Sequence, residues 1–149
     1  MRALVQRVSS GGVYIEENEH RAEIGRGLVI LLGVTEGDGE NELNFVADKC
    51  SNLRIFDDEN GKMNLSVKDV HGEVLIISQF TLYGDTRKGN RPSYTNAANP
   101  ELADKLYIAF IERMKQNLGN EKVKTGQFGA MMEVKIVNDG PVTLLVESK

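Results

Sequence analysis

The chain contains very little cysteine and histidine, and this scarcity excludes several classes of site. Its single cysteine, Cys50, cannot form an internal disulfide, which fits a reducing compartment. The two histidines, His20 and His71, lie far apart in the sequence, and no cysteine cluster accompanies them. No zinc-binding spacing is therefore present. We expect no disulfide framework, no metal and no cofactor.

The chain also lacks a long hydrophobic run. The longest apolar stretch, Leu28–Leu32, is far shorter than the roughly 20 residues that cross a membrane. Near the N-terminus, Arg2 and Arg7 flank an apolar stretch that is too short for a signal peptide. We expect a soluble cytoplasmic protein, and the length of 149 residues predicts one domain over residues 1–149.

Common catalytic motifs are missing as well. The sequence has no GxSxG elbow, no P-loop and no GxGxxG, so it gives no support for a serine hydrolase, an NTPase or a dinucleotide-binding protein. Neither histidine lies beside a polar motif, so no nucleophile–base pair is visible. The net charge of −4 argues against a broad basic surface that coats nucleic acid.

Hydrophobic periodicity and turn residues predict about eight strands and two helices. The helices are expected over Glu40–Asn52, capped by Asp38, and from Pro100, capped by Asn99, to a stop at Gly119. Cys50 lies on the apolar stripe of the first helix and is expected to be an inert core thiol. Together these elements predict an α+β fold: one domain with a mostly antiparallel, barrel-like β-sheet and two main helices. The expected strands are Met1–Val8, Val13–Glu16, Arg21–Ile24, Gly27–Val34, Val74–Ile77, Val123–Thr125, Met132–Val137 and Val142–Glu147, with a hairpin of Leu53–Phe56 and Lys62–Asn64.

Three turn segments interrupt this pattern. Ser10–Gly12 predicts a break between the first two strands, and Asn138–Pro141 predicts a turn before the last strand. Asn60-Gly61 predicts the tip of the hairpin. The acidic residues before that tip lack the spacing of an EF-hand loop, so we interpret them as a solvated turn.

The most informative stretch is Val74–Asp85. A buried strand, Val74–Ile77, is followed directly by the polar residues Ser78, Gln79 and Thr81. These side chains could bond back to the backbone as the strand turns. They could equally carry chemistry, because strand ends and the loops after them present functional groups. Composition and periodicity leave both interpretations open.

A long segment without helical or strand periodicity follows, over Tyr83–Asn99, which we call the basic loop. It carries Arg87, Lys88 and Arg91 against the single acidic residue Asp85, a local balance of +2. Loops of this length in a compact domain are usually functional or disordered. The basic residues, with Pro92 and Tyr94, favour a binding loop.

Seven blocks of sequence follow one another along nearly the whole chain: VQRV (5–8), GLVILLGV (27–34), LRIFDDENGKMNLSV (53–67), SQFTLYGD (78–85), KGNRPSY (88–94), TGQFGAMMEV (125–134) and NDGPVT (138–143). Together, and in this order, they resemble the D-aminoacyl-tRNA deacylase family. The resemblance implies a hydrolase that cleaves the ester bond of D-aminoacyl-tRNA, and of glycyl-tRNA, while rejecting L-aminoacyl-tRNA, in translation quality control. It also implies a homodimer with cross-subunit active sites that bind the 3′ end of aminoacylated tRNA.

The same resemblance implies the roles of individual residues. Backbone N–H groups around Phe80 and Thr81 would hold the carbonyl oxygen of the ester, and Gln79 and Phe80 would bound the adenosine. Gly140-Pro141 would be a cis peptide whose carbonyls reach into the partner subunit's pocket, and Arg7 would brace that turn. Arg87, Lys88 and Arg91 would contact the RNA. The full substrate-binding set is Ser78, Gln79, Gly140, Pro141, Val142, Thr143 and Arg7.

Three alternatives remain at this point. Thr81 could be a nucleophile, although an activated ester with a vicinal ribose hydroxyl needs positioning more than a strong base, which favours substrate-assisted attack. Without the resemblance, Gly140-Pro141 would be trans and Arg7 an exposed strand residue. The chain could also bind RNA ends without catalysis. Its low aromatic content of 6% disfavours that role, because a stacking platform needs several exposed aromatics.

Overall fold

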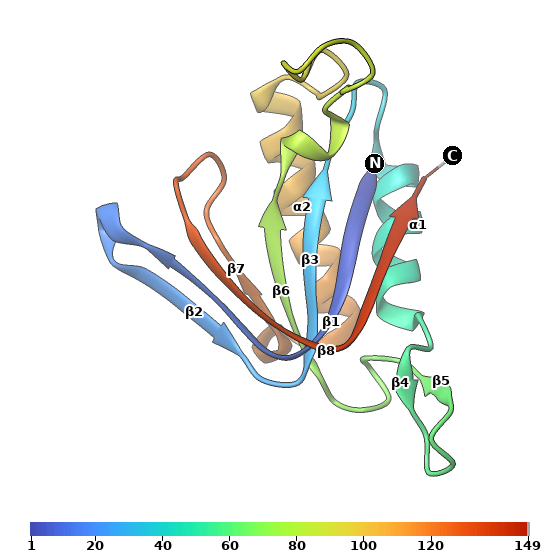
Figure 1. Ribbon diagram of the computed structural model, residues 1–149. Coiled ribbons are helices and arrows are strands. Elements are labelled where there is room, and N and C mark those ends of the chain that lie inside the picture. Colours follow the sequence, from blue (N-terminus) through green and yellow to red (C-terminus); the bar gives the residue numbers. More distant parts are fainter. Residues whose placement is uncertain (149) are drawn as a thin grey trace.

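A six-stranded mixed sheet organises residues 1–148, the part of the chain that the computed structural model describes (Figure 1). Its order is β2-β1-β3-β6-β7, with β8 paired to β1. β1 pairs antiparallel with β2, β3 and β8, whereas β3–β6 and β6–β7 are parallel. The predicted α+β fold with a barrel-like sheet and two helices is confirmed. The strands are β1 (Arg2–Ile15), β2 (His20–Ile24), β3 (Gly27–Gly33), β6 (Glu73–Ser78), β7 (Val123–Thr125) and β8 (Glu133–Glu147).

The two longest strands, β1 and β8, pair with each other along their length and bend together near their middle (Figure 1). The predicted break at Ser10–Gly12 is wrong, because β1 continues through it to Ile15. At the predicted turn Asn138–Pro141, β8 does not end, but Gln6 pairs with Thr143 and Val8 with Asn138, so residues 139–142 bulge out of the ladder. We call this bulge the Gly140-Pro141 turn. Register shifts between Gln6 and Ser10 allow the bend, since bulges kink a strand without ending its ladder.

The bend gives the sheet two hydrophobic cores, one on each face. On one face, Leu28, Ile30 and Ile76 pack against helices α1 (Glu40–Asn52) and α2 (Pro100–Leu118). On the other face, the curled halves of β1, β2 and β8 cover Val29, Leu75 and Ile77 (Figure 1). The alternation of side chains along β3 and β6 therefore fills both cores, which explains why these strands have such apolar sequences.

The helix boundaries follow from local sequence. Asn99 Oδ1 accepts a hydrogen bond from the Leu102 N–H at 3.0 Å, and Pro100 begins α2. Helix α1 begins at the predicted residue, but its N-cap is Gly39 and not Asp38. Asp38 does not cap the helix because its carboxylate binds the ammonium group of Met1 at 2.7 Å and the Thr35 N–H at 2.9 Å. Of the helices in residues 1–148, none is long and apolar enough to span a membrane.

The remaining elements are short. Strands β4 (Phe56–Asp57) and β5 (Met63–Leu65) form the predicted hairpin, and Asp58 Oδ1 caps its turn by accepting from the N–H groups of Asn60 and Lys62. Cys50 is fully buried in the helix-side core, and burial raises the pKa of its thiol to about 12, as expected for an inert thiol. The other elements of residues 1–148 are three 3₁₀ turns: η1 (Glu16–Asn18), η2 (Phe80–Tyr83) and η3 (Asn120–Lys122).

Gly27, where β3 begins, approaches β6 so closely that no side chain fits. A Cβ there would lie 1.7 Å from the Glu73 carbonyl oxygen. Gly27→Ala must push the two strands apart, so we expect it to lower the free energy of unfolding by about 3 kcal/mol in a urea titration. Gly25→Ala is the matched control, because its Cβ would make an ordinary 3.5 Å contact with Glu73 Oε1. Equal stability of the two variants would contradict this.

Candidate active site

The polar end of β6 turns directly into η2. The Gln79 N–H donates to the Leu32 carbonyl at 2.8 Å and so extends the parallel pairing, and Leu82 N–H then donates to the Gln79 carbonyl at 3.3 Å. Within residues 1–148, the N–H groups of Phe80 and Thr81 have no hydrogen-bond acceptor. The turn therefore presents two consecutive free donors, as the first residues of a helical turn do.

The side chains at this strand end do not bond back to the backbone. In the described part of the chain, Gln79 Nε2 donates to Thr81 Oγ1, and this is the one hydrogen bond among the side chains of Ser78, Gln79 and Thr81. The interpretation that these groups satisfy the turning backbone is therefore wrong. Phe80 is 54% exposed, which is unusual for a large apolar residue, and its ring is available for contact with a ligand.

A cleft of about 850 Å³ opens beside this strand end. Its walls are mostly apolar, and Tyr94 is the sole titratable side chain among them. Phe80 and Tyr94 meet edge to face with ring centroids 5.1 Å apart, so together they form an aromatic wall. The lining residues are Ile77, Ser78, Gln79, Phe80, Tyr94, Ala97, Ala98, Pro100, Ala103, Phe128, Gly129, Ala130, Met131, Met132 and Val134.

Sequence reasoning missed one wall of this cleft, the segment from Phe128 to Met132 between β7 and β8. Phe128 packs on Tyr107 of α2 with ring centroids 6.1 Å apart, and Tyr107 Oη donates to the Ile76 carbonyl at 2.9 Å. Burial raises the pKa of the Tyr107 hydroxyl, which keeps it a neutral donor. The signal available in the sequence was a short apolar segment without helical periodicity. The structure adds that Met131 in this segment is 90% exposed.

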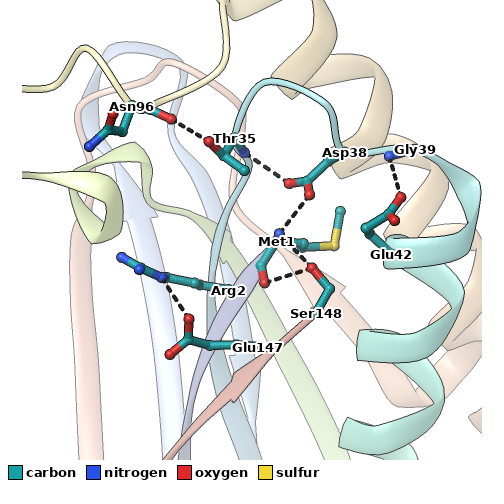
Figure 2. Close-up of polar contacts among 9 residues, drawn as sticks. All are labelled: Met1, Arg2, Thr35, Asp38, Gly39, Glu42, Asn96, Glu147 and Ser148. Atoms are coloured by element: carbon teal, nitrogen blue, oxygen red, sulfur yellow. Dashed lines mark hydrogen bonds and ion pairs between the residues drawn. The ribbon is translucent and has the colours of Figure 1, made fainter.

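Polar contacts at the start of β1 anchor the far end of the basic loop (Figure 2). The Met1 ammonium group binds Asp38, whose carboxylate also accepts from the Thr35 N–H. Thr35 Oγ1 in turn donates to the Asn96 carbonyl, and the Ala98 N–H donates to the Val34 carbonyl at 2.9 Å. These bonds hold the loop against the strand end and so fix the side of the cleft that it forms.

The three basic residues of this loop differ in availability. Arg87 forms a two-pronged ion pair with Asp85, with a shortest N–O distance of 2.6 Å. The hydrogen-bonded guanidinium lowers the pKa of Asp85 to about 2, so the pair persists at neutral pH. Lys88 and Arg91 are exposed. The uncompensated positive charge of the loop therefore rests on Lys88 and Arg91.

Arg7 braces the bend of β8. Its Nε donates to the Asp139 carbonyl at 3.0 Å, and its terminal nitrogen donates to the Ile55 carbonyl at 2.6 Å. The carboxylates of Asp139 and Asp57 lie 3.4 and 3.9 Å from the guanidinium. Arg7 is only 8% exposed, so the alternative of a surface strand residue is wrong. The expected brace is confirmed, and the Gly140-Pro141 peptide is cis as expected.

Within one chain, this bend does not reach the cleft. Strand β3 lies between the two sites: Ser78 at the cleft pairs with Leu32, and Arg7 at the bend pairs with Leu28. The two sites are therefore offset by four residues along the strand direction, which is about 13 Å. Three strand spacings, from β8 through β1 and β3 to β6, add about 14 Å across the sheet. Gly140, Pro141 and Thr143 are exposed on the surface, and Val142 packs partly against the helix-side core.

Comparison with known proteins gives a consistent result over the full chain. The family model described as D-Tyr-tRNA(Tyr) deacylase matches residues 4–147. A protein of Thermosipho africanus named D-aminoacyl-tRNA deacylase is 55% identical over 149 residues, which are 100% of this chain and 98% of the relative. A protein of the same name from Clostridioides difficile is 54% identical over 99% of this chain and 97% of the relative.

Two solved structures have the same fold. One, named c-Myc DNA Unwinding Element Binding Protein, has a TM-score of 0.93 and 42% sequence identity, and the match covers 100% of this chain and 99% of that one. The other, named as a probable eukaryotic D-amino acid tRNA deacylase, has a TM-score of 0.85 at 16% identity, covering 99% of this chain and 98% of that one. At that identity the second likeness concerns the fold alone.

Proposed function

The chain belongs to the D-Tyr-tRNA(Tyr) deacylase family, and we propose that it hydrolyses the ester bond of D-aminoacyl-tRNA to free amino acid and tRNA. The observation that carries this proposal is the family match over residues 4–147, which includes every element of the cleft. The substrate is the 3′ end of an aminoacylated tRNA. The protein works in the cytoplasm, where aminoacyl-tRNA serves translation.

The cleft suits a reaction that depends on positioning. Its lining contains no carboxylate, histidine, lysine or cysteine to act as a strong base. The free N–H groups of Phe80 and Thr81 would stabilise the oxyanion that develops on the ester carbonyl. A water molecule adds to the carbonyl carbon and gives one proton to the vicinal ribose 2′-hydroxyl. That hydroxyl passes its own proton to the 3′-oxygen as the C–O ester bond breaks.

The complete site is composite, with each protomer of a homodimer lending its Gly140-Pro141 turn to the partner's cleft. Support comes from the distance of the turn from the cleft within one chain, together with its exposure. A two-fold dimer is self-complementary, so a turn that enters the partner's cleft does so twice. Exposed Val137, Leu144 and Leu145 on β8 provide apolar surface for such a contact.

The turn would select against L-amino acids by steric exclusion. Favourable contacts to many different D side chains cannot discriminate strongly, since one methylene is worth only about 1–3 kcal/mol. Backbone carbonyls are rigid, and the bond from Arg7 to the Asp139 carbonyl holds the turn in place. A filter that excludes the L side chain cannot reject glycine, which has none, so glycyl-tRNA is also a substrate.

A second candidate function is nucleic-acid binding without hydrolysis. It is favoured by the similarity to a solved structure whose name describes a DNA-element binding protein. Against it, the aromatic side chains that line the cleft are only Phe80, Tyr94 and Phe128, of which Phe128 packs on Tyr107, and the chain carries a net charge of −4. Hydrolysis by stoichiometric enzyme distinguishes the two functions.

Single-turnover hydrolysis of D-tyrosyl-tRNA tests the activity and the role of Thr81 together. We expect the wild type to release D-tyrosine, to cleave glycyl-tRNA, and to leave L-tyrosyl-tRNA intact.

The Thr81→Ala variant should lose less than about tenfold in hydrolysis rate, whereas removal of a nucleophile costs up to about a millionfold in kcat. A substrate ending in 2′-deoxyadenosine should resist cleavage. Equal rates on D- and L-substrates would refute the filter, and a thousandfold loss in folded Thr81→Ala would make Thr81 the nucleophile.

Complementation tests the composite site. Ser78→Trp should block the cleft and Arg7→Met should release the turn, so each variant alone should be inactive. Co-expressed, the mixed dimer contains one intact site, made from the cleft of the Arg7→Met chain and the turn of the Ser78→Trp chain. Random pairing should restore about a quarter of wild-type activity. Absence of rescue in mixtures shown by mass spectrometry to contain mixed dimers would place the whole site within one chain.

The contribution of the basic loop to RNA binding is measurable from salt dependence. We propose that Arg87, Lys88 and Arg91 face the tRNA, and that Lys88 and Arg91 supply most of the attraction because Arg87 is paired with Asp85. Lys88→Gln with Arg91→Gln should reduce the slope of log K against log salt by about 0.7 for each lost contact to a single strand. Lys62→Gln in the β4–β5 hairpin is the control. An unchanged slope in the double variant would locate the RNA elsewhere.

A further inference from the structure

The guanidinium group of Arg2, at the start of β1, makes three contacts. One terminal nitrogen donates to the Leu82 carbonyl at 3.0 Å. The guanidinium carbon lies 4.5 Å from the centre of the Tyr83 ring, which is a cation–π geometry. Nε donates to Glu147 Oε2 of β8 at 3.1 Å (Figure 2). The guanidinium therefore has a defined position between β8 and the η2 turn.

The η2 turn lies beside Arg2 because β3 ends in glycine. Gly33 pairs with Arg2 across the β1–β3 ladder. A Cβ on Gly33 would lie 3.1 Å from Leu82 Cβ and 3.2 Å from both the Gln79 carbonyl oxygen and the Tyr83 ring. The turn thus packs on bare backbone of β3, within reach of an arginine on the neighbouring strand.

The Leu82 carbonyl belongs to the last turn of a 3₁₀ helix, where backbone acceptors have no partner within the helix. Arg2 supplies the donor, and a charge-assisted hydrogen bond of this kind is stronger than a neutral one. Tyr83 provides the apolar face beneath the guanidinium. Burial raises the pKa of Tyr83 to about 12, so the ring carries no charge at neutral pH.

We propose that Arg2 is a positioning residue, which holds the Leu82 carbonyl and thereby aims the N–H groups of Phe80 and Thr81 at the reacting ester. This inference rests on the proposed function of those two N–H groups. Leu82 directly follows Thr81 in the same four-residue turn, so movement of its carbonyl is transmitted to both amides. The entry to the turn is held by the Gln79–Leu32 bond, and Arg2 holds its exit.

Arg2→Met tests the proposal, because it keeps the aliphatic stem and removes the donors. We expect kcat for D-tyrosyl-tRNA to fall about tenfold to a hundredfold with little change in KM, since a misplacement of about 1 Å can cost a hundredfold. The amide NMR signals of Phe80 and Thr81 should shift. Arg2→Lys, which retains a charged donor, should recover part of the lost rate.

Glu147→Gln is the matched control, because it removes the ion pair with β8 and leaves the contacts to Leu82 and Tyr83. Equal losses in Glu147→Gln and Arg2→Met would mean that Arg2 only joins the strands, which overturns the proposal. Unmoved amide signals or an unchanged kcat in folded Arg2→Met overturn it as well. If Arg2→Met does not fold, Tyr83→Leu removes the ring beneath the guanidinium and should move the same two signals.

The same measurements separate this inference from the proposed function. A wild-type protein that does not cleave D-tyrosyl-tRNA would refute the proposed function, and the positioning role of Arg2 with it. An active wild type whose turn and rate are insensitive to Arg2→Met would refute the role of Arg2 alone.

Discussion

The parallel pairing of β3 with β6, and of β6 with β7, is the constraint that locates the site. Parallel strands end at the same edge of a sheet, so the segments that follow β3, β6 and β7 emerge together. Those segments are the Val34–Gly39 connection, η2 with the basic loop, and residues 126–132. The second and third of these segments line the cleft. The close approach of Gly27 to Glu73 sets the spacing of this pairing at the opposite end.

The composite site that we propose would present mainly backbone groups, and arginine side chains of β1 hold two of the segments that carry them. Arg7 binds the carbonyls of Asp139 and Ile55, and Arg2 binds the carbonyl of Leu82. A guanidinium suits this task because its planar fork can satisfy two acceptors at once and remains charged at any physiological pH. The recognition through backbone groups that we propose fits the lining of the cleft, in which Tyr94 is the one titratable side chain.

Local sequence was enough to predict most elements, because their signals are local. The cap at Asn99, the stop at Gly119 and the apolar run of β3 depend on neighbouring residues alone. The break expected at Ser10–Gly12 was wrong because pairing with β2 and β8 keeps that glycine-rich segment extended. Asp38 was misassigned as an N-cap because the ammonium group of Met1, distant in sequence, binds its carboxylate.

The candidate site was less predictable than the fold. The strand end at Ser78–Thr81 was visible from its change in polarity, but Arg7 and Gly140-Pro141 were identified only by resemblance to a family. No local pattern indicates that a buried arginine binds carbonyls of residues 48 and 132 positions away. The apolar wall from Phe128 to Met132 carries no motif. Its residue types are the same as those of a hydrophobic core, so composition does not distinguish the two.

The shared bend of β1 and β8 also determines which parts of the molecule can unfold locally. Each of these strands contributes to both cores, so neither core can separate from the sheet without breaking the ladder that joins the two strands. Regions that cannot open independently exchange their amide hydrogens as one cooperative unit. The slowly exchanging amides should therefore run through β1, β3, β6 and β8 without a boundary at the bend.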